Sequence, residues 1–288
     1  MKILILFFLY FFLSVSLSLA QTISGDHDYS LKSLLKSKPS IEVSYGVSDI
    51  KFSGTPYNFS PTGLIELNLG FTSNNTSKFR KNIVSYKNRF LFLSFNSEEN
   101  SVKSNNSGIK SNLWKFGLGN KSGYGVSIGK SAAILPYSSR TFNWSNFKYD
   151  KQTDNSSALS DENYYSELDN MSGVFRFGSS FEAGINLQIT KGFSIQPKYE
   201  TADIFPRHLA GKQLMSSAIE YAGFGLLETF TKAVMKNSPV AGTFVNFILL
   251  NAYEYGFYQL KKDQMYWPFV SSAPLRYETF KLGMTFVF

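Results

Sequence analysis

The chain has 288 residues, a formal net charge of +8 and no cysteine, so disulfide frameworks and thiolate metal sites are excluded. Aromatic residues make up 17% of the chain, with 28 Phe and 17 Tyr, yet the mean hydropathy is only −0.13. That mixture is unusual for a soluble secreted domain and fits strands with one apolar and one wet face.

Residues 1–20 predict a secretory signal peptide. Lys2 precedes an apolar core from Ile3 to Leu13, and the small-residue pattern Ser18-Leu19-Ala20 follows. Cleavage is expected after Ala20. The alternative is a membrane anchor, but the apolar core is short for a span of ~20 residues. A basic chain exported in this way meets anionic lipid headgroups more readily than nucleic acid.

Eight segments of the mature chain alternate apolar and polar residues with the period of a strand. They are IEVSYGV (41–47), LIELNLGF (64–71), RFLFLSF (89–95), LWKFGLG (113–119), YGVSIG (124–129), FEAGINLQIT (181–190), FSIQPKYE (193–200) and the closing RYETFKLGMTFVF (276–288). A β-sandwich has the same period, so the connections and the polar faces must distinguish the two folds.

The connections between these segments are expected to alternate in length. Tight turns are predicted at 120–123 and 191–192, whereas 48–61, 96–110, 131–172 and 204–275 are long. The connection 72–88 breaks the rule because it is long and basic. The polar faces are rich in Gly, Ser, Asn and Gln, which is typical of a wet interior. Both features favour a barrel over a sandwich.

Residues 212–262 change to the period of a helix. Leu214, Ile219, Leu226 and Phe230 recur at helical spacing, and Ser238-Pro239 is a break with proline at the start of a second helix. We expect a helical hairpin inside the last outer loop. Three placements stay open: a cap over the barrel mouth, an amphipathic pair in the outer-leaflet interface, or a docking surface for a partner protein.

With these patterns the chain resembles the small outer-membrane β-barrels of Gram-negative (diderm) bacteria. Its closing segment is similar to the assembly signal of that class. The residues of that signal are Phe280, Leu282, Met284, Phe286 and Phe288. The resemblance implies an all-β fold: an antiparallel transmembrane barrel of about eight strands, with ten possible. It also implies recognition by the barrel-assembly machinery.

The expected domain layout is a signal peptide at 1–20, a periplasmic arm at 21–40 and a barrel at 41–288 with the helical insertion at 212–262. Inside a barrel of ~8 strands, side chains fill the lumen. The lumen-facing candidates are Glu42, Glu66, Lys115, Glu182, Lys198, Glu200 and Lys281. Both signs of charge in a narrow interior favour ion pairing, so we expect a closed barrel with a helical cap.

The expected function is a non-enzymatic structural or surface-contact role in the outer membrane. A narrow channel or transporter for small solutes is one alternative, and a lipid-modifying enzyme is another. Barrels of the lipid-hydrolase kind pair a His with a Ser two residues later. Here Tyr29 follows His27 and Ala210 follows His208, so that motif is missing. We expect no catalytic residue, metal site or cofactor.

The expected partners are outer-membrane lipids with lipopolysaccharide-type headgroups, the barrel-assembly machinery and a protein at the helical insert. Nucleic acid is not expected as a partner.

Overall fold

The structure is a computed structural model that describes residues 37–53, 58–78, 82–101, 108–129, 131–150, 166, 168–207 and 209–288. The predicted signal peptide, most of the predicted arm, and both histidines lie outside these ranges.

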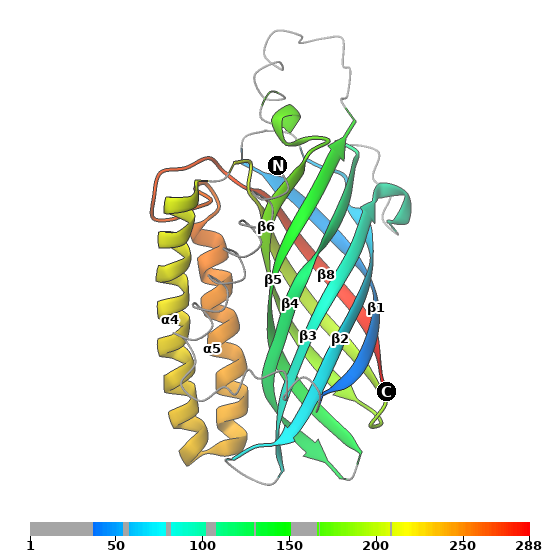
Figure 1. Cartoon of the computed structure of the whole chain (residues 1–288), viewed down its shortest axis with the longest axis vertical. Helices are drawn as coiled ribbons and strands as arrows, with labels where there is room; N and C mark the ends of the chain where they lie inside the picture. The colour runs from blue at the N-terminus through cyan, green and yellow to red at the C-terminus, as the bar shows by residue number, and fades with distance from the viewer. Residues whose placement is uncertain are drawn as a thin grey trace, which may run out of the picture. The chain divides into compact units, whose positions relative to one another are not determined.

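Within the described residues, eight antiparallel strands close into a barrel in chain order (Figure 1). They are β1 (Lys38–Phe52), β2 (Thr62–Thr76), β3 (Ile83–Ser97), β4 (Ser111–Ile128), β5 (Ala132–Tyr149), β6 (Phe175–Gln188), β7 (Phe193–Ile204) and β8 (Leu275–Val287). The last strand pairs with the first, with Val43 opposite Met284. The predicted antiparallel barrel of about eight strands is confirmed.

The strand prediction was wrong at two places, β4 and β5. The segments 113–119 and 124–129 belong to one strand, β4, so the turn predicted at 120–123 does not exist. The predicted long loop at 131–172 contains β5, an 18-residue strand. The strand count came out right because one strand was split and another was missed.

The connections follow the expected alternation, without the exception at 72–88. Residues 72–76 and 83–88 extend β2 and β3, which leaves a short connection at 77–82. The connections 129–131 and 189–192 lie at the same end of the barrel. At the other end are 53–61, 98–110, 150–174 and 205–274, and the second of these holds the 3₁₀ helix η1 (Glu98–Asn100).

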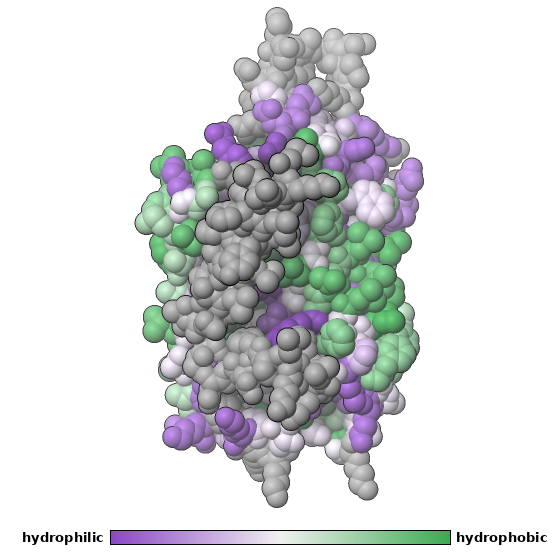
Figure 2. Space-filling view, in the orientation of Figure 1, coloured by the Kyte–Doolittle hydropathy of each residue, from purple (hydrophilic) through white to green (hydrophobic). Residues whose placement is uncertain are grey.

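The barrel is apolar outside and polar inside. The large apolar side chains that point outward include Val43, Ile65, Leu69, Leu91, Leu93, Trp114, Phe116, Phe142, Phe280, Leu282 and Met284, each at least 40% exposed. Figure 2 shows hydrophobic side chains gathered at mid-height on the visible face, with hydrophilic ones toward both ends. Strand alternation with period two separates the two sets, because neighbouring residues point to opposite faces.

Two helices, α4 (Ala210–Asn237) and α5 (Pro239–Leu260), follow β7. Ser238 separates them, and Pro239 occupies the first turn of α5, where its missing N–H costs nothing. Together they form an antiparallel helical hairpin, in which Gly242 packs directly on Met235. In the described part of the chain, no helix is long and apolar enough to cross a membrane.

The helical hairpin does not cap the barrel mouth, so that expectation was wrong. It stands beside the barrel, roughly along its long axis (Figure 1), and α5 packs on β4, β5 and β7. The Ser138 hydroxyl on the outer face of β5 donates to Asn251 of α5 at 3.1 Å, and Arg140 pairs with Glu254. The helices lie on the wall because their polar side chains find partners there.

Candidate functional site in the barrel lumen

The structure places all seven lumen candidates inside the barrel, where each residue is at most 5% exposed. Even-numbered residues of β1, β2, β6 and β7 point inward, which brings in Glu42, Glu66, Glu182, Lys198 and Glu200. Odd-numbered residues of β4 and β8 point inward, which adds Lys115 and Lys281. An eighth charge, Lys121 of β4, joins them. Four glutamates therefore face four lysines, and the charges of this set of eight balance.

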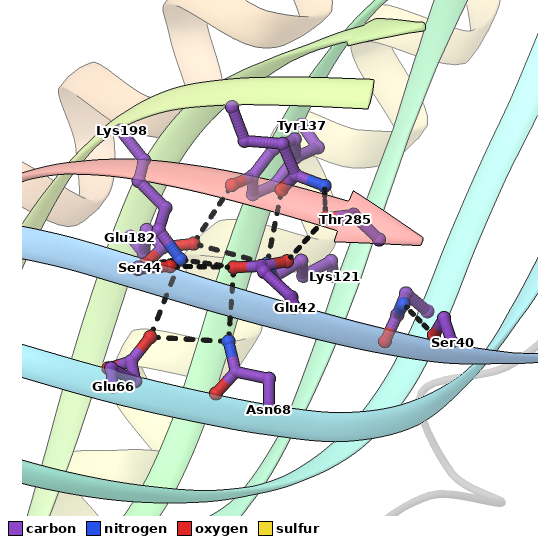
Figure 3. Close-up of polar contacts among 12 residues, drawn as sticks. Ser40, Glu42, Ser44, Glu66, Asn68, Lys121, Tyr137, Glu182, Lys198 and Thr285 are labelled. Carbon is purple, nitrogen blue, oxygen red and sulfur yellow. Dashed lines mark hydrogen bonds and ion pairs between the residues drawn. The ribbon is translucent and has the colours of Figure 1, made fainter. Parts of the chain in front are cut away.

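The eight charges form one network across the lumen. Figure 3 shows Lys198 pointing toward Glu42 and Glu66 of the first two strands. Lys121 crosses from β4 to reach a Glu42 oxygen at 2.6 Å. Since β4 and β1 are not neighbours in the sheet, this ion pair spans the interior.

Lys281, like Lys198, pairs with three of the four glutamates. Its ammonium lies 3.1 Å from Glu66, 2.7 Å from Glu182 and 2.5 Å from Glu200. Lys115 completes the network with a Glu200 oxygen at 3.0 Å. Each buried charge has a partner of opposite sign, as charges removed from water require.

Neutral groups extend the network on one side. The Tyr137 hydroxyl donates to Glu182 at 3.0 Å, and Asn68 donates to Glu42 at 3.1 Å. Gly184 gives the tyrosine ring its room, because a Cβ there would lie 2.4 Å from the ring. Tyr86 packs edge-on against Tyr137, with ring centroids 5.7 Å apart.

An apolar cluster lies in the barrel at the end that carries the long connections. Strand residues supply part of it, and Phe59, Ile109, Leu168 and Met171 enter from three connections. Phe59 and Ile109 form a bridge between the β1–β2 and β3–β4 connections. These residues occupy the position expected for the helical cap.

Lys121 and Tyr137 were missed because β4 was split and β5 was not recognised. A signal for β4 was available in the sequence. Trp114, Phe116 and Leu118 share even numbering with Tyr124, Val126 and Ile128, so the outward phase runs unbroken across the supposed turn. With that phase, Lys121 falls on the same face as Lys115.

The charged residues of the lumen form ion pairs that link strands across the barrel interior. Every carboxylate of the network is engaged by ammonium groups, and the hydroxyls of Ser44 and Thr285 also donate to Glu42, at 3.3 and 3.1 Å. Among the described residues, no group of three or more His, Cys, Asp or Glu side chains is arranged to hold a metal ion.

Comparison with known proteins gave likenesses of shape only. No family model matches the chain, and no curated protein matches it. Among solved structures, Neisserial surface protein A (NspA) is similar at 8% identity and a TM-score of 0.38, covering 87% of this chain and 97% of that one. The attachment invasion locus protein Ail of Yersinia pestis is similar at 9% identity and 0.32, covering 88% and 99%. OprG of Pseudomonas aeruginosa is similar at 12% identity and 0.29, covering 88% and 96%.

Proposed function

We propose that this protein is an integral outer-membrane β-barrel without enzymatic activity, which contributes to envelope structure and surface contacts. One observation carries the proposal: the barrel is inverted relative to a soluble protein, with charged groups in its core and large apolar side chains on its surface. In hydrocarbon, backbone groups must be satisfied within the protein, and a closed barrel does this. The predicted signal peptide supplies the export route.

The lumen is closed in this proposal. The eight-charge network crosses the middle, and the apolar cluster at Phe59 and Ile109 seals the end with long connections. A conducting pore needs a continuous column of water, which these two layers interrupt. Ion conductance would therefore be the result that favours the channel alternative.

The proposed partners follow from the two ends and the closing strand. Lys148, Arg207 and Lys262 are exposed at the end with the long connections, where they would meet the phosphates of lipopolysaccharide-type headgroups. The barrel-assembly machinery would recognise β8 through the alternation that ends at Phe288.

The test is to refold residues 21–288 in detergent and to run the protein on SDS gels with and without boiling. We expect a faster band in the unboiled sample, because closed barrels resist SDS until heated. In planar bilayers we expect no ion conductance. Discrete conductance steps would replace the closed barrel with the channel. Identical boiled and unboiled bands, from a chain that stays folded and soluble without detergent, would overturn the membrane assignment.

A further inference from the structure

The helical hairpin, like the barrel, exposes large apolar side chains and buries polar ones. On α5 the exposed stripe is apolar, with Val240, Phe244, Ile248 and Tyr255 at helical spacing. The buried residues of that helix include polar ones, which are Thr243, Asn246 and Glu254. A helix docked on a protein in water has the opposite arrangement.

The second helix follows the same rule. Large apolar side chains on α4 are exposed, including Leu214 at 56%, Leu226 at 74% and Phe230 at 55%. Its three buried residues are Ser216, Thr231 and Met235. Thr231 accepts a hydrogen bond from Asn246 of α5 at 2.7 Å, so polar groups pair between the helices.

The charges near the middle of the helical hairpin also turn inward. Glu254 is the only charged residue of α5, and it is 3% exposed and paired with Arg140 on the barrel wall. Glu220 of α4 pairs with Lys261 at 2.5 Å. Together these residues help line a cavity of about 70 Å³ between the helices and strands β5–β7. The polar side of the hairpin is therefore the side against the barrel.

The apolar side continues the apolar band of the barrel. In Figure 2 the visible edge of the hairpin carries hydrophobic residues at the height of that band, and hydrophilic residues at its lower tip. The tip contains Lys236 and Asn237, both exposed. At 1.5 Å per residue, helices of 28 and 22 residues reach about 42 and 33 Å. A hydrocarbon core is ~30 Å thick.

We propose that the helical hairpin lies upright in the bilayer beside the barrel, with its outer face in contact with lipid hydrocarbon and its polar face sealed against β5–β7. This inference rests on the proposed membrane insertion of the barrel. Neither helix is apolar all round, so each depends on the wall and on its partner helix to shield its polar side chains.

The chain contains no cysteine, which allows a clean test with single spin labels. The labelled variants are Leu226→Cys on α4 and Ile248→Cys on α5. Leu91→Cys reports the barrel wall, since Leu91 is 63% exposed on β3. Lys262→Cys reports water, since Lys262 is exposed beyond the end of α5. Each variant is refolded into phosphatidylcholine vesicles, and collision rates with oxygen and with a nickel chelate are measured.

We expect the labels at positions 226, 248 and 91 to collide often with oxygen and rarely with the chelate, with the reverse at position 262. If 226 and 248 match 262 while 91 stays in lipid, the inference about the hairpin is wrong and the barrel proposal stands. If 91 also matches 262, the barrel proposal itself fails. Labels at 226 and 248 that reach neither probe would mean that a second protein surface covers the helices, which also overturns the inference.

Discussion

At the scale of single residues, the lumen lysines differ in how many carboxylates depend on them. Lys281 contacts Glu66, Glu182 and Glu200, whereas Lys115 contacts only Glu200 among the lumen glutamates. Removing one partner from a buried ion pair leaves an uncompensated charge, which costs about 3–5 kcal/mol. The cost should therefore follow the number of carboxylates that lose a contact with an ammonium group.

We expect Lys281→Met to lower the free energy of unfolding by about 3–5 kcal/mol, because three glutamates lose a shared cation. Lys115→Met should cost less, since Glu200 keeps Lys281. Lys191→Met, at an exposed turn position, is the control and should change nothing measurable. Urea titrations of the gel mobility shift in detergent give the three values. Equal losses for Lys281→Met and Lys115→Met would show that the network is not shared in this way.

At the scale of single elements, period two predicted most of the barrel but could not reveal β5. On the segments that were predicted as strands, most outward positions are apolar, so the alternation is clear even though α5 also packs on β4 and β7. On β5 the outward positions include Pro136, Ser138 and Arg140, and the last two bond to α5. A strand covered by protein carries polar outward residues, and its alternation disappears from the sequence.

The sequence predicts that the two helices exist, but it does not predict where they lie on the barrel. Helical spacing and Ser238-Pro239 predicted two helices with the correct break. Their location depends on pairs such as Arg140 with Glu254, which are 114 residues apart. Single-sequence periodicity carries no information about such contacts, so the hairpin was expected over the mouth and lies on the wall.

The helical hairpin also depends on close packing at one glycine. Neither helix begins with a side-chain cap, so its stability comes mainly from tertiary contacts. A Cβ at Gly242 would lie 2.6 Å from the Met235 Cα. By contrast, a Cβ at Gly256 of the same helix meets nothing within 4 Å.

We expect Gly242→Ala to destabilise the helical hairpin by about 1–3 kcal/mol, because the two helices must move apart. Gly256→Ala is the matched control and should be neutral or stabilising by up to about 1 kcal/mol through helix propensity. Thermal loss of helical circular dichroism at 222 nm, measured in detergent, compares the two. A Gly242→Ala protein as stable as the Gly256→Ala protein would contradict the observed helix contact.

At the scale of the whole molecule, the barrel exists only when β8 pairs with β1. The register aligns Val43 with Met284, and both side chains point outward. Two strands in register bring paired Cβ atoms within ~5.5 Å, which is close enough for a disulfide after small adjustments.

We expect the double variant Val43→Cys with Met284→Cys to form a disulfide on mild oxidation of the refolded protein. Val43→Cys with Leu93→Cys is the control, because β3 is not adjacent to β1. The crosslink is read as a mobility difference between boiled samples with and without reductant. Absence of crosslinking at 43 and 284, in a protein that otherwise shows the heat-dependent shift, would mean a different closing register.

The position of the helices in the chain also has a consequence for the order of folding. Strands β7 and β8 are neighbours in the sheet, yet residues 205–274 separate them. Closing a loop of that length costs more chain entropy than closing the short turns at the other end. A helical hairpin already docked on β5–β7 brings the start of β8 back beside β7, and so shortens the search for the final pairing.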